Sequence, residues 1–249
     1  MKESSDTHSN LDYVILETLH THGQPIGSGT LHYVLRKRGD NLSAPTIGRK
    51  LRDLEHRGLV SKVSVEGRIL TGAGERLLRQ LEQERRLETS GDKLLKLLKR
   101  SSRKDIIDQL TARRVIESET AALAARNASA QQIQALEHLI AQGYYLVEHG
   151  DTGIKADVDF HETIAEASGN NILSAVVTVL RSQAWLNQVI AAIRAKVGGQ
   201  LVVDHEEIIK AIREHNPERA RKAMVKHLDK LIADVDRYWE QVYSDRGSD

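Results

Sequence analysis

Residues 43–60 read Ser-Ala-Pro-Thr-Ile-Gly-Arg-Lys-Leu-Arg-Asp-Leu-Glu-His-Arg-Gly-Leu-Val, and the architecture of the first part of the chain can be built outward from them. Ser43 is a favourable helix N-cap, a proline is well tolerated in the first helical turn, and Gly58 is a typical stop signal. Between these limits the apolar residues recur at the spacing of one helix face, namely at Ile47, Leu51 and Leu54. The segment is therefore predicted to be a short helix that buries one face.

Two helices are expected before this segment and a β-hairpin after it. Apolar residues at helical spacing run from Leu11 to Leu19 and again within Thr30 to Arg38, and a glycine follows each run. Beyond Leu59 the apolar residues alternate with a period of two, Glu66-Gly67 supplies a turn, and residues 68–71 can return as a second strand. Three helices followed by a hairpin form the layout of a winged helix-turn-helix.

The remainder of the chain has the periodicity of helices, without strand alternation. A charged helix is expected at 74–86, and residues 89–104 are expected to hold a break, a short amphipathic stretch and a second break. Further helices are expected at 105–126, 130–149, 154–167, 171–195, 202–214 and 217–243. The fold class is therefore mainly α, with a winged helix-turn-helix domain at 1–88, a linker at 89–104, an all-α bundle at 105–243 and a tail at 244–249.

Composition narrows the chemistry that is available to this chain. Its 249 residues include no cysteine, which excludes a disulfide scaffold, a thiolate nucleophile and any metal site held by cysteine. No apolar run approaches the ~20 residues that cross a bilayer, and the first ten residues, MKESSDTHSN, lack the apolar centre of a signal peptide. A cytoplasmic protein without a membrane partner is expected.

The charges are nearly balanced overall but unevenly distributed along the chain. Residues 26–79 carry a net charge of +6 and residues 89–104 carry +5, whereas residues from 105 to the end carry −6. A basic first part suggests a polyanion as its partner, and an acidic second part suggests a different ligand.

The predicted third helix would enter the major groove of double-stranded DNA, and the hairpin would contact the backbone or the minor groove. The residues expected to contact DNA are Ser43, Thr46, Arg49, Lys50 and Arg52 on this helix and Arg68 on the wing. Arginine can fork onto guanine or phosphate, whereas lysine mainly supplies charge. Two alternatives stay open, in which these cations only solvate a surface helix or the winged helix contacts protein.

Three of the eleven histidines stand in sequence contexts that fit a metal site. Asp157 and His161 are four residues apart, so both side chains can reach one ion from the same helix face. His205 opens a predicted helix, and His227 shares a helical stripe with apolar residues. A histidine on an apolar face is also commonly a hydrogen-bonded core residue, and the spacing alone leaves both readings open.

Two resemblances to known families add to this interpretation. Residues 43–60 with 65–71 and Gly74 resemble the N-terminal winged helix of NrpR-type regulators, and they lack the V-S-R-x-P-V-R-E-A-L pattern of the usual GntR head. The second half is similar to the FCD domain, the effector-binding domain of many GntR-superfamily regulators, over about residues 105–243. The motifs that carry this similarity are Arg114-Val-Ile-Glu117, Asp157-x-x-Phe-His161, Glu166-Ala-Ser-Gly-Asn170, His205-x-x-Ile208 and His227-Leu228.

The FCD resemblance implies a ligand set and an effector site. In the metal-binding branch of that family one aspartate and three histidines hold a divalent ion, and the matching residues here are Asp157, His161, His205 and His227. Zinc is the first expectation, with nickel, cobalt or manganese as alternatives, and a six-coordinate ion keeps two positions for water or an effector. A small carboxylate could fill them, with Arg114 as a second anchor and Asn170 turned toward the pocket. Arg114 could equally form a surface ion pair, and Asn170 could cap the next helix.

These expectations define a ligand-responsive transcriptional regulator that binds operator DNA as a homodimer and is not an enzyme. A metal-dependent hydrolase or lyase is the alternative, but neither His161-Glu162 nor His205-Glu206 extends to H-E-x-x-H. A second alternative is a DNA-binding dimer whose metal is purely structural.

Overall fold

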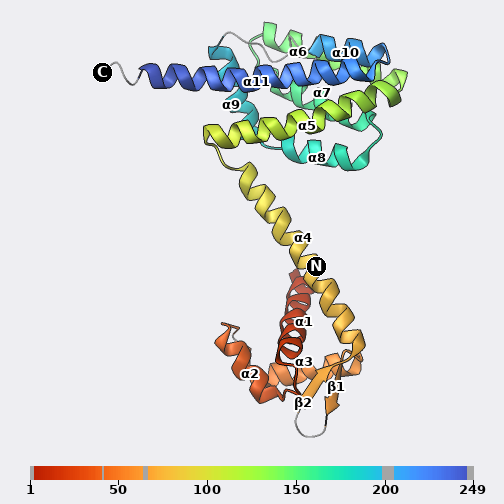
Figure 1. Cartoon of the computed structure of the whole chain (residues 1–249), viewed down its shortest axis with the longest axis vertical. Helices are drawn as coiled ribbons and strands as arrows, with labels where there is room; N and C mark the ends of the chain where they lie inside the picture. The colour runs from red at the N-terminus through yellow and green to blue at the C-terminus, as the bar shows by residue number, and fades with distance from the viewer. Residues whose placement is uncertain (1–2, 41, 64–66, 198–204, 246–249) are drawn as a thin grey trace. The chain divides into compact units, whose positions relative to one another are not determined.

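The computed structural model describes residues 3–40, 42–63, 67–197 and 205–245, and it divides into two compact units, Met1–Lys93 and Leu94–Asp249 (Figure 1). The division falls inside the long helix α4, Gly72–Leu98. The sequence predicts a break at residues 89–91, but α4 continues through them, so most of the predicted linker is helical. Extending an existing helix costs far less than starting one, and three weak helix formers in an exposed stretch do not offset that difference.

The first unit is a three-helix head with a β-hairpin. Its helices are α1 (Glu3–His22), α2 (Ser28–Lys37) and α3 (Ala44–His56), and its strands are β1 (Val60–Val63) and β2 (Gly67–Leu70). The strands are antiparallel, with Val60 opposite Leu70, and they complete the predicted winged helix-turn-helix. The core is apolar and is formed by fully buried residues that include Ile15, Leu16, Leu31, Leu35, Ile47, Leu51 and Leu54.

A glycine fixes the base of the wing against the segment that follows α1. Ile26 pairs with Arg68 of β2 through two backbone hydrogen bonds of 3.0 and 2.9 Å. A Cβ atom at Gly67, whose φ is +136°, would lie 2.1 Å from the backbone carbonyl carbon of Ile26. Glycine is therefore required here both by the close approach and by the backbone conformation.

The second unit is entirely helical over its described residues. Its helices are α5 (Arg103–Asn127), α6 (Ala130–Glu148), α7 (Ile154–Ala167), α8 (Asn171–Arg181), α9 (Ala184–Lys196), α10 (His205–Arg213) and α11 (Pro217–Asp245). The long helices α5 and α11 pack against each other, and α7 packs against α5, α6 and α8 (Figure 1). Residues 202–204 of the predicted helix 202–214 and residues 246–249 of the predicted tail lie outside the described part. The predicted mainly α fold is confirmed.

One predicted helix, 171–195, is in fact two. It ends at Arg181 and resumes at Ala184 as α9. The Arg113 guanidinium donates a hydrogen bond to the Leu180 carbonyl, and the Asn187 side chain donates one to the Arg181 carbonyl. These side chains satisfy carbonyl groups that a continuing helix would have bonded, so α8 can end without a glycine or proline.

Among the described residues, no helix combines the length and the apolar character that a membrane crossing requires.

Candidate functional site

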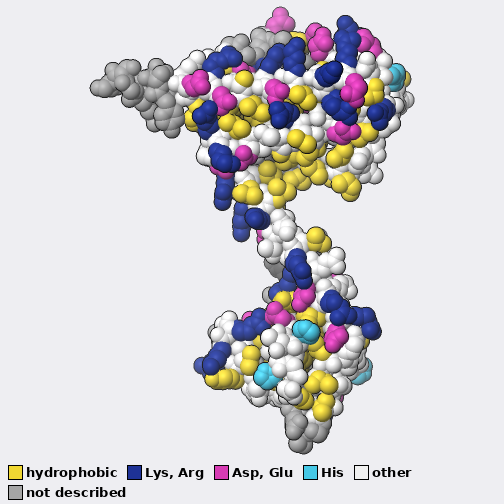
Figure 2. Space-filling view, in the orientation of Figure 1, with side chains coloured by type: hydrophobic (Ala, Val, Ile, Leu, Met, Phe, Trp, Pro, Cys, Tyr) yellow, Lys and Arg dark blue, Asp and Glu magenta, His cyan; other side chains and the backbone are white. Residues whose placement is uncertain are grey.

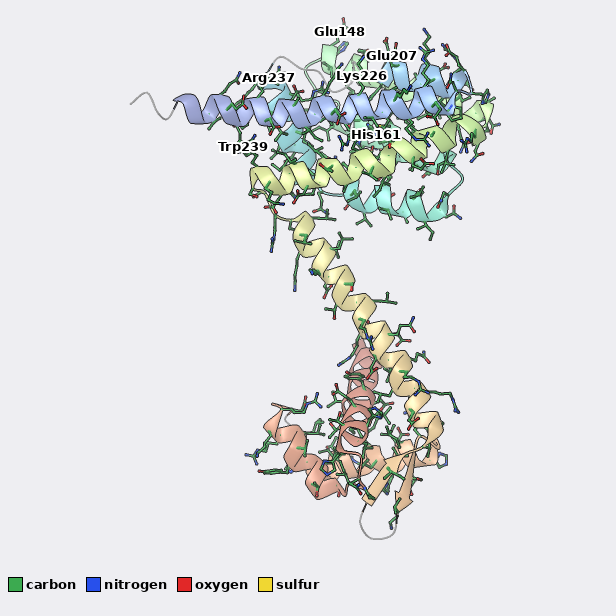
Figure 3. The ribbon with its side chains drawn as sticks, in the orientation of Figure 1. Glu148, His161, Glu207, Lys226, Arg237 and Trp239 are labelled. Atoms are coloured by element: carbon green, nitrogen blue, oxygen red, sulfur yellow. The ribbon has the colours of Figure 1, made fainter. Side chains whose placement is uncertain are left out.

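Four side chains from three helices meet inside the second unit. Asp157 and His161 come from α7, His205 is the first residue of α10, and His227 comes from α11. Each offers one possible ligand atom, these atoms all lie within 4.8 Å of one another, and all four residues are buried. Figure 3 labels His161 in the interior of this unit. The structure thus brings together the whole predicted ligand set.

Packing holds the imidazole rings in a compact group. Asp157 Oδ1 lies 3.3 Å from His205 Nε2 and 3.8 Å from His161 Nε2. The three ring centroids are 4.9 to 5.2 Å apart, and the Phe160 ring stacks on His205 at 4.3 Å. His227 stands on the buried stripe of α11 together with Ala220, Met224 and Leu231, as its sequence spacing indicates.

A buried ion-pair network, which sequence reasoning missed, surrounds this group. Glu117 of α5 places Oε2 at 2.6 Å from His161 Nδ1. Arg181 of α8 donates to both oxygens of Glu117, at 2.9 and 2.7 Å, and to Asp157 Oδ2 at 2.9 Å. The only available signal in the sequence was an arginine at the end of the otherwise uncharged run from Asn171 to Leu180. Such a charge is buried only with partners, and those partners are distant in sequence.

The network sets protonation states that suit a cation. Burial opposes ionisation of Asp157, but the Arg181 charge outweighs it and holds the Asp157 pKa well below its usual value. Burial also opposes ionisation of Glu117, whose pKa is lowered by Arg181 and His161. Burial and the Arg181 charge lower the pKa of His161 to about 4, and burial with the neighbouring His205 and His161 lowers that of His227. At neutral pH the carboxylates are charged and these two imidazoles are neutral, as metal ligands must be.

The inward-facing atoms fit a divalent metal ion. Asp157 Oδ1, His161 Nε2 and His205 Nε2 are buried and make no hydrogen bond to any described residue. Buried polar atoms of this kind are costly unless something binds them. Three imidazole nitrogens and one carboxylate oxygen form a donor set for zinc and similar metals. The contact of Glu117 with the other nitrogen of His161 is the arrangement that orients a ligating histidine.

A small cavity adjoins the group and is lined by Arg113, Ile154, Asp157, Arg181, Asn187, Ile190 and Leu231. Its volume of about 10 Å³ corresponds to one water molecule. Arg113 donates to Asn187 Oδ1 at 3.2 Å, and its Nε is buried without a hydrogen bond to the described residues. Burial and the Arg181 charge lower the pKa of Arg113 to about 10, so it remains a cation at neutral pH.

The two residues predicted to hold an effector lie elsewhere, and this is a correction. Arg114 forms a 2.7 Å ion pair with Asp229 of α11 at the surface. Asn170 is exposed and caps α8 by accepting hydrogen bonds from the backbone N–H groups of Ile172 and Leu173. Successive helix residues differ by about 100° in direction, so the arginine that reaches the cavity is Arg113 and not its neighbour.

In the head, the predicted DNA contacts separate into exposed residues and residues used within the fold. Ser43 caps α3 by accepting from the Thr46 backbone N–H. Arg49 and Arg52 are exposed on α3, and Thr46 is partly buried in its first turn. These four residues remain candidates for DNA contact.

Lys50 and Arg68, which were also predicted to contact DNA, form ion pairs within the head. Lys50 lies 2.6 Å from Asp12 of α1 and 3.2 Å from Asp53, and only 12% of its side chain is exposed. Arg68 donates two hydrogen bonds to Glu55, so it ties the wing to α3. Their acidic partners neutralise both cations. Lys62, which sequence reasoning did not single out, is exposed on β1.

Comparisons with known proteins agree with this two-part description. Residues 108–230 match the FCD domain, and residues 13–78 match the ribonuclease R winged-helix domain. The winged-helix class of the head is thereby confirmed, while the NrpR resemblance stays a prediction. The solved structure of Streptococcus agalactiae GntR aligns with 92% of this chain and 98% of its own, at 24% identity and a TM-score of 0.44.

Two curated relatives are transcriptional regulators. The Uxu operon regulator of Haemophilus influenzae is 30% identical over 131 residues, which are 49% of this chain and 48% of the relative. The HTH-type transcriptional repressor NanR of Escherichia coli K12 is 31% identical over 125 residues, 47% of this chain and 45% of the relative. The matched region thus spans about half the length of each relative.

A winged-helix head followed by an FCD domain defines a class of transcriptional regulators. This chain carries a winged-helix head and an FCD domain, and its similarity to such regulators supports a place among the GntR-family members with an FCD C-terminal domain. These relatives are transcriptional regulators, and neither is a metal-dependent hydrolase or lyase.

Proposed function

We propose that this chain is a cytoplasmic, homodimeric regulator that binds operator DNA through its head. In this proposal the second unit binds a divalent metal and a small carboxylate, which together change the affinity for DNA. The convergence of four buried ligand side chains within an FCD domain is the observation that carries the proposal. A symmetric dimer would present two copies of α3 to a pseudo-palindromic site.

Zinc is the first candidate for the metal, and nickel, cobalt or manganese could use the same donors. Asp157, His161, His205 and His227 would hold the ion, which would supply positive charge and open coordination positions for an oxygen ligand. The charges of Arg113 and Arg181 already balance those of Asp157 and Glu117. A bound divalent ion would leave an excess of positive charge beside the cavity, and an anionic ligand would reduce it.

The effector would act by preferring one arrangement of the protein over another. Binding changes DNA affinity only through its differential affinity for the two arrangements. Because the adjoining cavity holds about one water molecule, a carboxylate effector has to displace side chains to enter it. Arg113 and Asn187 are the side chains that such a ligand would contact first.

The metal assignment is tested by elemental analysis of the whole chain after chelation and reloading with Zn²⁺ alone. The wild-type chain is expected to bind one ion, and the His161→Ala and His227→Ala variants are expected to bind none. His138→Ala is the matched control, because His138 is exposed on α6 of the same unit. Full metal content in both ligand variants would refute the assignment.

The DNA assignment needs an operator, which can be selected from a random duplex library with the zinc-loaded protein. Titration with small carboxylates is then expected to change affinity for the selected duplex without changing the helical content. A duplex affinity that no cavity ligand alters would refute the regulatory part.

A purely structural metal is the second candidate function, and the small volume of the cavity favours it. Thermal melts separate the two, because a sensor gains stability from a specific carboxylate in addition to that gained from the metal.

A further inference from the structure

Three successive turns of α5 place polar side chains in the interior of the second unit. Gln109, Arg113 and Glu117 are four residues apart, so they follow one another along one side of the helix. All three are buried, with exposed fractions of 6%, 2% and 1%. We call this row the polar stripe of α5. Buried polar groups cost free energy unless they are bonded, so each residue of the stripe needs partners that offset this cost.

Gln109 is the residue of the stripe that neither the metal site nor the adjoining cavity uses. Its Nε2 donates a hydrogen bond of 3.3 Å to the backbone carbonyl of Arg100. Its Oε1 is buried and accepts no hydrogen bond from the described residues. An apolar side chain of similar size would avoid the cost of this bare oxygen. The presence of a glutamine here therefore directs attention to its contact with Arg100.

Arg100 belongs to the connection between α4 and α5, residues 99–102, which we call the α4–α5 junction (Figure 1). The residues of the junction are exposed. Figure 2 shows Lys and Arg side chains gathered where Figure 1 draws the start of α5. Because α4 runs without a break from the first unit into the second, the junction is where the second unit holds the end of that helix. Gln109 thus links the interior of the bundle to the backbone of this exposed connection.

Arg113 lies one turn after Gln109 on the stripe and lines the cavity. Its guanidinium donates to the Leu180 carbonyl at 2.7 Å and to Asn187 Oδ1 at 3.2 Å, while its Nε is buried without a hydrogen bond to the described residues. An unused donor on Arg113 and an unused acceptor on Gln109 therefore start from Cβ atoms that are about 5–6 Å apart on one side of α5. A shift of either side chain would join the two groups.

We infer that Gln109 is the positioning residue that couples the cavity to the α4–α5 junction. An anion that enters the cavity replaces Asn187 as the partner of the Arg113 guanidinium. Arg113 then donates from Nε to Gln109 Oε1, and the Gln109 side chain withdraws from the Arg100 carbonyl. The junction is held when the cavity is empty and released when it is occupied. This inference rests on the proposed function, because it gives the route by which a bound carboxylate favours another arrangement of the protein.

Filter binding and calorimetry of the whole, zinc-loaded chain test the coupling, with malonate and acetate as probes. In the wild type, a bound carboxylate is expected to change the affinity for the selected duplex by about tenfold. The Gln109→Met variant keeps the side-chain size and loses both polar atoms. Its duplex affinity is expected to change by less than about twofold, while its affinity for the carboxylate stays within about threefold of the wild type. Gln134→Met is the matched control and is expected to keep the full response, because Gln134 is exposed on α6 of the same unit.

Hydrogen exchange of the junction is a second readout, which a purely structural role of Gln109 would not change. Malonate is expected to speed the exchange of the backbone amides of residues 99–102 in the wild type. In Gln109→Met this exchange is expected to be fast already and to ignore malonate. Gln109→Glu keeps an acceptor for Arg113 and loses the donor to Arg100, so it is expected to behave in the same way. If Gln109→Met loses its helical circular dichroism, Gln109→Glu decides the question with both readouts.

A folded Gln109→Met variant that binds malonate and keeps the wild-type response of the duplex and of the junction overturns the inference. Loss of malonate binding in this variant also overturns it, because Gln109 would then belong to the ligand site itself. If bound malonate changes the junction of the wild type but not its duplex affinity, the proposed function fails and the coupling stands. A wild type that binds neither probe overturns both.

Discussion

The two units of this chain place their charged side chains in opposite ways. In the head, the buried core is almost wholly apolar, and cations such as Arg38 and Arg68 pair with acidic residues that stay partly exposed. In the second unit, the buried Arg181 pairs with both Glu117 and Asp157 inside the bundle. Buried ion pairs contribute little net stability. Their presence in the second unit therefore suggests that these residues serve a function rather than stability alone. This contrast fits the proposed function, in which the head binds DNA with its surface and the second unit binds its ligands in its core.

The strongest way to break this contrast is to remove the central cation. Arg181→Met leaves Glu117 and Asp157 as buried, uncompensated carboxylates, and the free energy of unfolding is expected to fall by about 3–5 kcal/mol. Arg114→Met is the control, because its exposed pair with Asp229 should contribute less than about 1 kcal/mol. Urea unfolding of the metal-free protein measures both. Equal losses in the two variants would remove the distinction between surface and interior pairs.

A subtler change tests the role of Glu117 as the residue that orients His161. Glu117→Gln is expected to lower zinc affinity by about 10–100-fold, because the imidazole loses its anionic partner. Competition with a chelating dye measures this affinity. Glu119→Gln, two residues further along α5 and paired with Arg221 at the surface, is expected to bind zinc like the wild type. An unchanged zinc affinity in the Glu117 variant would mean that packing alone orients His161.

Two adjacent residues of α3, Arg49 and Lys50, test whether exposed and ion-paired cations of the head have different roles. Arg49→Ala is expected to weaken binding to the selected duplex by about 1–3 kcal/mol while leaving stability nearly unchanged, since Arg49 is exposed. Lys50→Ala is expected to do the reverse, because it breaks the contact with Asp12. Filter binding and thermal melts report the two effects. The same pattern in both variants would mean that α3 does not present one face to DNA and the other to the core.

The smallest expected effect concerns Asn170. Asn170→Ala removes a helix cap and is expected to cost about 1 kcal/mol of stability. Zinc content and the response to carboxylates are expected to stay unchanged, because the side chain is turned to the start of α8. Loss of the carboxylate response would return Asn170 to the effector site.

Local signals in the sequence predicted most elements and their limits. Ser43 and Gly58 bound α3 as expected, and the change of apolar period after Leu59 marks the hairpin. The break between α8 and α9 could not be predicted in this way, because the groups that satisfy the last carbonyls of α8 belong to Arg113 and Asn187. One of these is far away in sequence, and neither resembles a helix stop signal.

The candidate site was accessible to sequence reasoning only in part. Spacing paired Asp157 with His161, and the family resemblance supplied His205 and His227. Glu117 and Arg181 were missed because their burial depends on contacts across three helices. The ion pairs of Lys50 and Arg114 were not predicted for a related reason, since the acid that neutralises each of them lies on another helix. A single sequence does not show which charged residues pair when they are far apart along the chain.

Arg181 pairs with both Glu117 and Asp157, and this pairing bears on how a metal bound at the proposed site would be exchanged. A zinc finger unfolds when it loses its ion, because little else holds its chain together. In this unit the carboxylates already have a counter-ion, and an extensive apolar core surrounds them. Under the proposed function the folded chain would not need a metal to hold it together, so the same molecule could be emptied and refilled, as a reversible detector must be.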